Sequence, residues 1–229
     1  MIKITLPDGA VKEYEQGVTA LDVAKSISEG LARKVLAASI NNEVWDATRP
    51  IQTDSSLKLL TWDDAEAKST YWHSSAHLMA EAIEATFAGA KFWVGPAVEN
   101  GFYYDVDLGE NKITEEDLVS LEKKMGELAK QNNTFLRKEI SKADAINYFT
   151  QKDDEYKLDL LQNLEDGNIT LYSQGAFTDL CRGPHIPATG AIKAIKLTSI
   201  AGAYWKGDVS KKQLTRIYGI TFPSNKELE

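Results

Sequence analysis

The chain has 229 residues, 43% of them hydrophobic, and a formal net charge of -8 at pH 7. This length suffices for a buried core and corresponds to one domain or two smaller ones. No stretch approaches the roughly 20 apolar residues of a membrane span, and the start lacks the layout of a signal peptide, so we expect a cytoplasmic protein. The acidic excess argues against a surface that neutralises many phosphates. Any role with nucleic acid must therefore be local, or assisted by another part of a larger protein.

Residues 1–62 are predicted to form a small β-grasp domain. Alternation over "IKITL", the turn "PDG" and a second strand are typical of a β-hairpin. Thr19 and Asp22 resemble a capping box at the start of a helix that ends before Gly30. The segments "KVLAASIN", "EVWD" and "LKLLTW" complete an order that we interpret as β-β-α-β-β, with one helix crossing a small mixed sheet. The acidic stretch "DDAEAK" marks the boundary of the domain.

Residues 63–224 are predicted to form a larger α+β domain with a mostly antiparallel sheet and a long helix. An apolar stripe at helical spacing predicts this amphipathic helix over residues 68–88. Further helices begin after Thr114 and Ser141, and a short helical segment follows in "DEYKLDLL". The strand-like segments are "KFWV", "GFYYDVDL", "TFLRKEI", "ITLYSQ", "AIKAIKLTSIAGAYW" and "KQLTRIYGITF". Residues 225–229 are interpreted as the start of a linker.

All three histidines and the only cysteine lie in two short windows, "HSSAH" at 73–77 and "CRGPH" at 181–185. His73 and His77 are one helical turn apart, so their side chains project from the same flank of the predicted helix, beside its apolar stripe. For a single histidine, a polar residue at the margin of the core would be the simpler interpretation. The shared spacing of the two windows favours a common polar site.

Cys181 and His185 are also four residues apart, but a Gly-Pro pair between them disfavours helical geometry and predicts a rigid loop after a strand. A single cysteine cannot form an internal disulfide. Three imidazoles and one thiolate are a donor set suited to tetrahedral zinc. The spacing leaves a metal centre and a metal-free catalytic cleft equally open, and a closed structural zinc site is the main alternative to both.

Five motifs in this order resemble the editing domain of bacterial threonyl-tRNA synthetases: "HSSAH", "NGFYYDVDL", "DLCRGPH", "AGAYWKGD" and "RIYGITF". Residues 1–61 resemble the TGS domain, the small β-grasp domain that precedes the editing domain in this family. The resemblance covers essentially the whole chain. It implies that the class II catalytic core and the anticodon-binding domain are absent, and that ATP and magnesium would serve only that core.

The resemblance implies an aminoacyl-tRNA deacylase that hydrolyses Ser-tRNA(Thr) to free serine and tRNA(Thr). A pocket built for threonine cannot strongly reject serine, because a missing methyl group is worth only about 1 to 3 kcal/mol. A second site that admits serine and excludes threonine by size would correct this error. The implied partners are the 3′ end of tRNA(Thr), serine and the remainder of the synthetase, with no membrane.

The resemblance also implies site residues. The catalytic set is His73, His77, Lys157, Cys181 and His185, and the substrate-binding set is Tyr104 and Asp179. His73 is the leading candidate for the group that positions or deprotonates water, because the pKa of histidine lies near neutrality. Lys157 and His185 are candidate donors or acids, Asp179 a partner for the serine ammonium, and Tyr104 part of the pocket wall. Without the resemblance, Lys157 would be a solvated helix lysine, Tyr104 a core aromatic and Asp179 a turn residue.

The expectation about the metal and the expectation about the function each have alternatives. The chain has "CRGPH" where the related alanyl-type editing domains, which bind zinc, typically have "CGGTH", so we expect no obligatory cofactor. If zinc is present, His73, His77, Cys181 and His185 would hold it. One alternative function is a freestanding alanyl-type zinc deacylase of Ser- or Ala-tRNA(Ala), against which the β-grasp domain argues. The other is a non-catalytic, zinc-stapled RNA-binding module, which would typically be basic.

Overall fold

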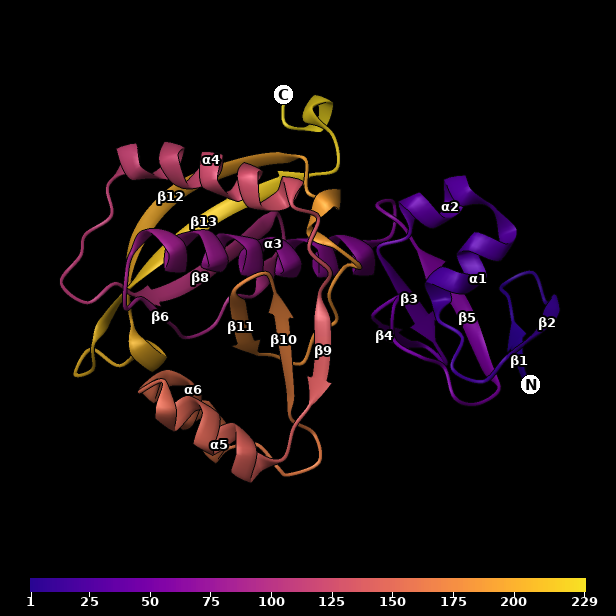
Figure 1. Ribbon diagram of the computed structural model, residues 1–229. Helices are drawn as coiled ribbons and strands as arrows, with labels where there is room; N and C mark the ends of the chain where they lie inside the picture. The colour runs from indigo at the N-terminus through magenta and orange to yellow at the C-terminus, as the bar shows by residue number, and fades with distance from the viewer. The chain divides into compact units, whose positions relative to one another are not determined.

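The computed structural model describes all 229 residues, Met1–Glu229, and divides into two compact units. Unit 1 contains Met1–Tyr71 and Gly183–Pro187, and unit 2 contains Trp72–Arg182 and Ala188–Glu229 (Figure 1). None of the helices combines the length and the apolar character that crossing a membrane requires.

Unit 1 contains a five-stranded mixed sheet with the strand order β2-β1-β5-β3-β4. Its strands are β1 (Ile2–Thr5), β2 (Val11–Tyr14), β3 (Ala37–Ile40), β4 (Glu43–Trp45) and β5 (Ser55–Leu60). β1 and β5 are parallel, and the other neighbours are antiparallel. Apolar residues of the sheet pack with Ala20, Val23 and Ala24 of helix α1 (Ala20–Ile27) in one core. The predicted β-grasp arrangement is therefore confirmed.

The three segments predicted as strands after the helix are confirmed as β3, β4 and β5, so the label β-β-α-β-β was one strand short. A second helix, α2 (Glu29–Lys34), which was not predicted, follows α1 directly. Ser28 separates the helices because its backbone is extended and its side chain accepts a hydrogen bond from Leu31 N at 3.0 Å. Gly30, which we interpreted as lying just beyond the helix, therefore lies inside α2.

The main sheet of unit 2 is antiparallel, with the order β12-β13-β8-β6 and β7 paired to β8. Its strands are β6 (Lys91–Phe92), β7 (Ala97–Val98), β8 (Gly101–Asp107), β12 (Ala194–Tyr204) and β13 (Gln213–Phe222). The long helix α3 (Ala65–Thr86) begins in unit 1 and continues through unit 2. It packs on this sheet through Ser75, whose Oγ lies 2.6 Å from Thr221 Oγ1.

Helix α4 (Glu115–Lys130) packs against β12, where Glu122 Oε1 accepts a hydrogen bond from Leu197 N at 2.8 Å. Leu197 pairs with Gly219, which is two residues from Thr221. Alternate residues of a strand share one face, so α3 and α4 pack on the same face of the main sheet. Both helices lie across this sheet in Figure 1.

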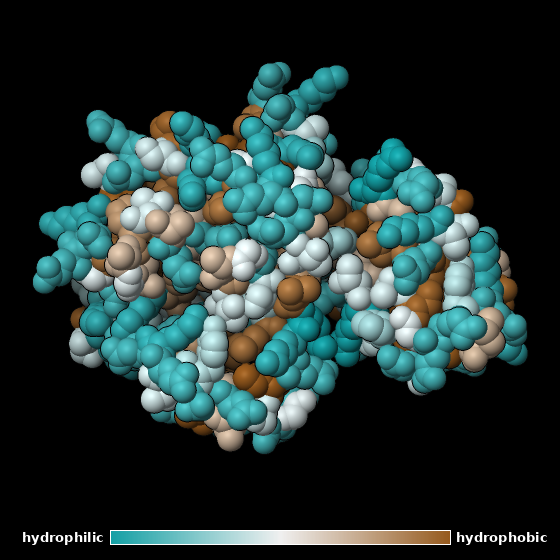
Figure 2. All heavy atoms as spheres, viewed as in Figure 1, coloured by the Kyte–Doolittle hydropathy of each residue, from teal (hydrophilic) through white to brown (hydrophobic).

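A second antiparallel sheet in unit 2 has the order β11-β10-β9. It contains β9 (Leu136–Glu139), β10 (Thr170–Gln174) and β11 (Phe177–Leu180), and it is accompanied by α5 (Lys142–Gln151) and α6 (Glu155–Gln162). Hydrophilic residues cover most of the face of this unit seen in Figure 2, and a hydrophobic group lies over β10 and β11. Short 3-10 turns occupy Thr189–Ala191, Trp205–Gly207 and Asn225–Glu227.

Strand β11 was not predicted. We expected residues 179–187 to be a loop, but Asp179 lies in β11 and the loop begins only after Leu180. Gly175, at φ +53°, makes the tight turn that joins β10 to β11. The broader prediction, an α+β chain with mostly antiparallel sheets and a long helix, is confirmed.

Candidate active site

Helix α3 brings His73 and His77 together. The two residues are one helical turn apart, and their ring centroids are separated by 5.0 Å in an edge-to-face arrangement. His77 is buried and its ring also meets Phe177 at 5.7 Å, whereas His73 is only half-buried. Of the two imidazoles, His73 is thus the one that solvent can reach.

Strand β11 and the residue that follows it place Asp179 and Cys181 beside this pair. Residues two apart on extended backbone point to the same side, as residues four apart do on a helix. Asp179 Oδ2 lies 3.4 Å from His77 Nε2, and Cys181 Sγ lies 3.4 Å from His73 Nε2. The spacing of two residues along extended backbone therefore matches the spacing of four residues along α3, so Asp179 meets His77 and Cys181 meets His73.

Lys157 reaches the same cluster from α6. Its Nζ lies 2.7 Å from Asp179 Oδ1 and donates a hydrogen bond to Trp93 O at 2.7 Å. Both members of this ion pair are almost completely buried, with Lys157 3% and Asp179 2% exposed. The interpretation of Lys157 as a solvated helix lysine, which its sequence context alone favoured, is therefore wrong.

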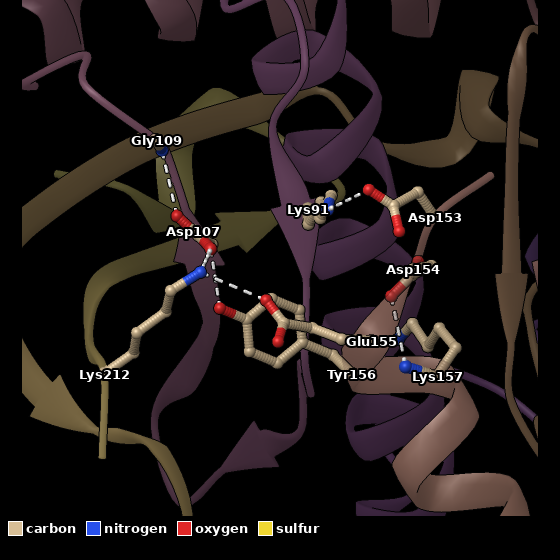
Figure 3. A network of polar contacts seen from close by, with 9 residues as sticks. All are labelled: Lys91, Asp107, Gly109, Asp153, Asp154, Glu155, Tyr156, Lys157 and Lys212. Atoms are coloured by element: carbon tan, nitrogen blue, oxygen red, sulfur yellow. Dashed lines mark hydrogen bonds and ion pairs between the residues drawn. The ribbon is translucent and has the colours of Figure 1, made fainter. Parts of the chain in front are cut away.

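Polar contacts hold α6 in the position that delivers Lys157 (Figure 3). Asp154 precedes the helix, and its Oδ1 accepts a hydrogen bond from Lys157 N at 3.1 Å. Tyr156 OH donates to Asp107 Oδ2 on β8 at 2.6 Å. Lys212 lies 3.3 Å from the same carboxylate oxygen and 3.1 Å from Glu155 Oε1. The helix is thus fixed to the main sheet at its first turn, where Lys157 lies.

Tyr104 approaches Asp179 from β8. Its hydroxyl donates a hydrogen bond to Asp179 Oδ2, and its ring packs edge-on against Phe92 at 5.3 Å between centroids. The backbone of Gly95 lies against the same ring: a Cβ at this position would be 2.3 Å from the nearest ring carbon. Tyr104 is therefore a core aromatic and a ligand of Asp179 at once.

The charges of this cluster follow from burial and from Lys157. Burial opposes ionisation of Asp179, but the Lys157 ammonium, His77 and the hydrogen bonds from Lys157 and Tyr104 together outweigh it, and the pKa of Asp179 lies below its ordinary value. Burial lowers the pKa of His77 to about 3, with Asp179 opposing this shift and His73 and Lys157 adding to it. Burial, reinforced by Asp179, raises the pKa of Tyr104 well above its ordinary value. Near neutral pH the cluster therefore holds an ionised Asp179, a neutral His77 and a protonated Tyr104.

His185 belongs to the segment Gly183–Pro187, which groups with unit 1. It is buried, and its backbone N–H donates to Asp46 Oδ1 at 2.6 Å. Gly183 has φ +70°, a left-handed conformation that favours glycine. The segment is thus irregular, as its Gly-Pro pair predicted, and it is anchored through its backbone.

A cavity of about 270 Å³ adjoins the buried ion pair in unit 2. Lys157, Asp179, Asp154 and Phe177 contribute to its wall, with residues from the end of α3, from β6 and from α5. Sequence reasoning missed Asp154, Phe177 and the Trp93 carbonyl as neighbours of the site. Only Asp154 carried a usable signal, because an aspartate just before a helix is a preferred N-cap.

Three side chains of the cluster could hold a metal ion. One ligand atom from each of His73, His77 and Cys181 lies within 4.8 Å of the other two. Two imidazoles and a thiol are a donor set that zinc accepts. The residues therefore fit zinc, and the same residues fit a site that handles water without a metal.

Two protein-family profiles match the chain. The TGS domain matches residues 2–61, and the threonyl and alanyl tRNA synthetase second additional domain matches residues 169–218. The chain thus carries both domains. The second additional domain includes Asp179 and Cys181, whereas both α3 histidines, Tyr104 and Lys157 lie outside the matched residues.

This chain is similar to threonine-tRNA ligases over its whole length. It is 65% identical over 229 residues to the threonine-tRNA ligase of Cytophaga hutchinsonii, and 60% identical over 230 residues to that of Porphyromonas gingivalis. Identity to the ligase of Bacteroides thetaiotaomicron is 55% over 229 residues. Each comparison covers all of this chain but only 35 to 36% of the relative. The TGS domain and the second additional domain together therefore resemble the N-terminal part of these ligases.

Proposed function

We propose that this chain is the editing part of a threonine-tRNA ligase and that it hydrolyses the serine ester of Ser-tRNA(Thr). The similarity to threonine-tRNA ligases over the whole chain supports the proposal, as does the match to the second additional domain. The observation that carries it is the buried series of contacts from Lys157 through Asp179 to His77. This series ends at a half-buried imidazole, His73, which lies against Cys181.

In this proposal His73 accepts the proton of the attacking water. A histidine at the border of a buried polar cluster can reach both a water molecule and the ester, and its ordinary pKa near neutrality suits a general base. His77, neutral because burial lowers its pKa, packs against His73 and adds no positive charge beside the base. The water oxygen would then bond to the ester carbonyl carbon, and the bond between that carbon and the ribose oxygen would break. The ribose oxygen would take up a proton and leave as a hydroxyl.

Lys157 is the proposed donor to the charge that develops on the ester. An ammonium has three N–H donors, and two of them serve Asp179 and the Trp93 carbonyl. The third can stabilise the oxyanion or donate a proton to the leaving ribose oxygen, a role also proposed for His185. Asp179 is the proposed partner of the serine ammonium, and in addition it fixes Lys157. Tyr104 shapes the pocket and holds Asp179.

The exclusion of threonine by size gives the direct test of this function. The 229-residue protein is expected to deacylate Ser-tRNA(Thr). The esters of Thr-tRNA(Thr) and Ser-tRNA(Ala) are expected to be hydrolysed no faster than in buffer. Release of radiolabelled amino acid from the three substrates, at matched concentrations, measures this. Equal cleavage of the serine and threonine esters would contradict the exclusion of threonine by size. Preferential cleavage of Ser-tRNA(Ala) would assign the chain to the alanyl type of deacylase, and no cleavage of any ester would overturn the function.

We also propose that hydrolysis needs no bound metal. If zinc binds, His73, His77 and Cys181, with His185 as the proposed fourth ligand, would hold it, and it would lower the pKa of a bound water. Protein purified without chelators is expected to carry far less than one zinc per chain by elemental analysis, and to keep its deacylase activity after dialysis against EDTA. Stoichiometric zinc, or activity lost to EDTA and restored by zinc, would contradict this proposal.

A further inference from the structure

Positive charge is concentrated in one hairpin of this acidic chain. Residues 191–222, which comprise β12, its turn, β13 and the three residues before β12, contain six Lys and Arg residues and one acidic residue, Asp208. The cations are Lys193, Lys196, Lys206, Lys211, Lys212 and Arg216. The hairpin therefore has a formal charge of +5 in a chain whose net charge is -8. A chain with this net charge spread evenly over its surface would not bind a polyanion. Because positive charge is concentrated in the hairpin, the hairpin offers a local site for one.

Some of these cations are free of internal ion pairs. Lys206 and Lys212 pair with acidic residues of α6 and β8, and Lys196 lies 3.6 Å from Glu122 Oε1. Lys193 and Lys211 are exposed and have no carboxylate within the 4.0 Å of an ion pair. These two lysines lie near opposite ends of β12 and β13, so the hairpin presents positive charge along its length.

Aromatic residues accompany the cations at the tip of the hairpin. Tyr204 is 42% exposed, and the ammonium groups of Lys206 and Lys211 lie 5.2 and 5.3 Å from the centre of the Trp205 ring. Trp205 also meets the Tyr156 ring edge-on at 4.9 Å, so α6 supports it. In Figure 1 the tip lies beside α6, away from α4.

A second aromatic group lies on the strands themselves. The Arg216 guanidinium is 4.2 Å from the centre of the Tyr103 ring, and the Tyr103 and Tyr218 rings are 5.5 Å apart. Asp105 fixes the guanidinium with two hydrogen bonds of 2.7 and 2.9 Å. All three members of the group, Tyr103, Arg216 and Tyr218, are half-buried.

This group faces away from α3 and α4. Gly219 and Thr221 lie on the helix-covered face, so Arg216 and Tyr218 alternate onto the opposite face. Their partners on β12 are Ala201 and Ser199, two small exposed residues. Small neighbours leave the rings and the guanidinium accessible, as a surface that stacks nucleobases requires.

We propose that the β12–β13 hairpin, residues 191–222, binds the RNA of the tRNA substrate. The lysines contact phosphates, and the Tyr103, Arg216 and Tyr218 group stacks against an unpaired nucleotide. That the RNA is tRNA rests on the proposed function, whereas the charge and the aromatic platform are independent of it. The negative charge on the rest of the chain repels phosphates and so confines RNA to this hairpin.

Binding of uncharged tRNA(Thr) to the 229-residue chain tests the proposal without any hydrolysis. The double variant Lys193→Gln, Lys211→Gln is expected to bind about tenfold more weakly at moderate salt. The slope of log K against log salt concentration should fall by about 1.5, because two phosphate contacts are lost. The matched control, Lys123→Gln with Lys130→Gln, makes the same charge change at exposed positions of α4 and should leave affinity and slope unchanged.

A second variant separates stacking from charge. Tyr103→Leu with Tyr218→Leu should lower affinity about tenfold and leave the salt slope unchanged, with circular dichroism reporting that the fold is kept. Equal affinity of the lysine double variant and its α4 control would overturn the proposal and leave the hairpin to a polypeptide partner. Absence of measurable tRNA binding at low salt would also overturn it. Normal binding without deacylation would instead refute the proposed function and keep the hairpin site.

Discussion

Replacing His73 with alanine is expected to lower the rate of Ser-tRNA(Thr) deacylation by about a hundredfold to ten-thousandfold, the usual contribution of a general base. His73 is the half-buried end of the buried polar series, where it contacts Cys181 and the edge of the His77 ring. Because the side chain is not a fully buried apolar group, its removal should leave the fold intact. Single-turnover deacylation and thermal unfolding of the same preparations measure the two effects.

The control for this experiment lies on the same helix. Thr86→Ala removes an exposed side chain at the far end of α3, where its hydroxyl donates only to Ala82 O, and it should keep full activity. A His73→Ala variant with unchanged deacylation would refute the assigned role. A variant that loses activity only because it is unfolded would show a lowered melting temperature, which the thermal measurement detects.

Lys157→Met is expected to lower the free energy of unfolding by about 3 to 5 kcal/mol and also to impair deacylation. The substitution keeps a side chain of similar length, but it leaves the Asp179 carboxylate buried without its ammonium partner, which is costly. Adding Asp179→Asn removes the uncompensated charge. The double variant should therefore recover part of the lost stability without recovering activity. Urea unfolding monitored by circular dichroism, beside the deacylation assay, checks both expectations.

An exposed ion pair of the same length serves as the control. Lys206 Nζ lies 2.7 Å from Asp159, as Lys157 does from Asp179, but the Lys206 and Asp159 side chains are 36% and 20% exposed. Lys206→Met should change the free energy of unfolding by less than about 1 kcal/mol. Equal losses in the two methionine variants would show that burial is not what makes the Lys157 contact important.

The histidines and the cysteine were visible in the sequence because their contacts follow local periodicities. A spacing of four residues on a helix predicts that His73 and His77 are neighbours, and the structure places their rings 5.0 Å apart. The contact between Cys181 and His73 joins residues 108 positions apart. Residue spacing does not predict a contact over this distance in the sequence. The only indication of it was that both residue types are rare in the chain.

Lys157 shows why the rest was hidden. A lysine in an acidic helical segment is ordinarily solvated, and its burial depends on Asp179 of β11 and on the carbonyl of Trp93, the residue after β6. Only the family resemblance pointed to it. Strand β11 was missed because "FTDL" is short and follows a glycine turn, so its pairing with β10 supplies the evidence that its composition lacks.

The close approach of Gly95 to the Tyr104 ring makes these two positions mutually dependent in evolution. Any side chain at position 95 would collide with the ring, so a substitution there becomes tolerable only after Tyr104 has been replaced by a smaller residue. That replacement would in turn deprive Asp179 of its phenolic donor. A protein that loses Gly95 stepwise would therefore first pass through a variant in which Asp179 lacks this hydrogen bond. The loop that contains Gly95 is thus constrained by Tyr104 on the adjoining strand.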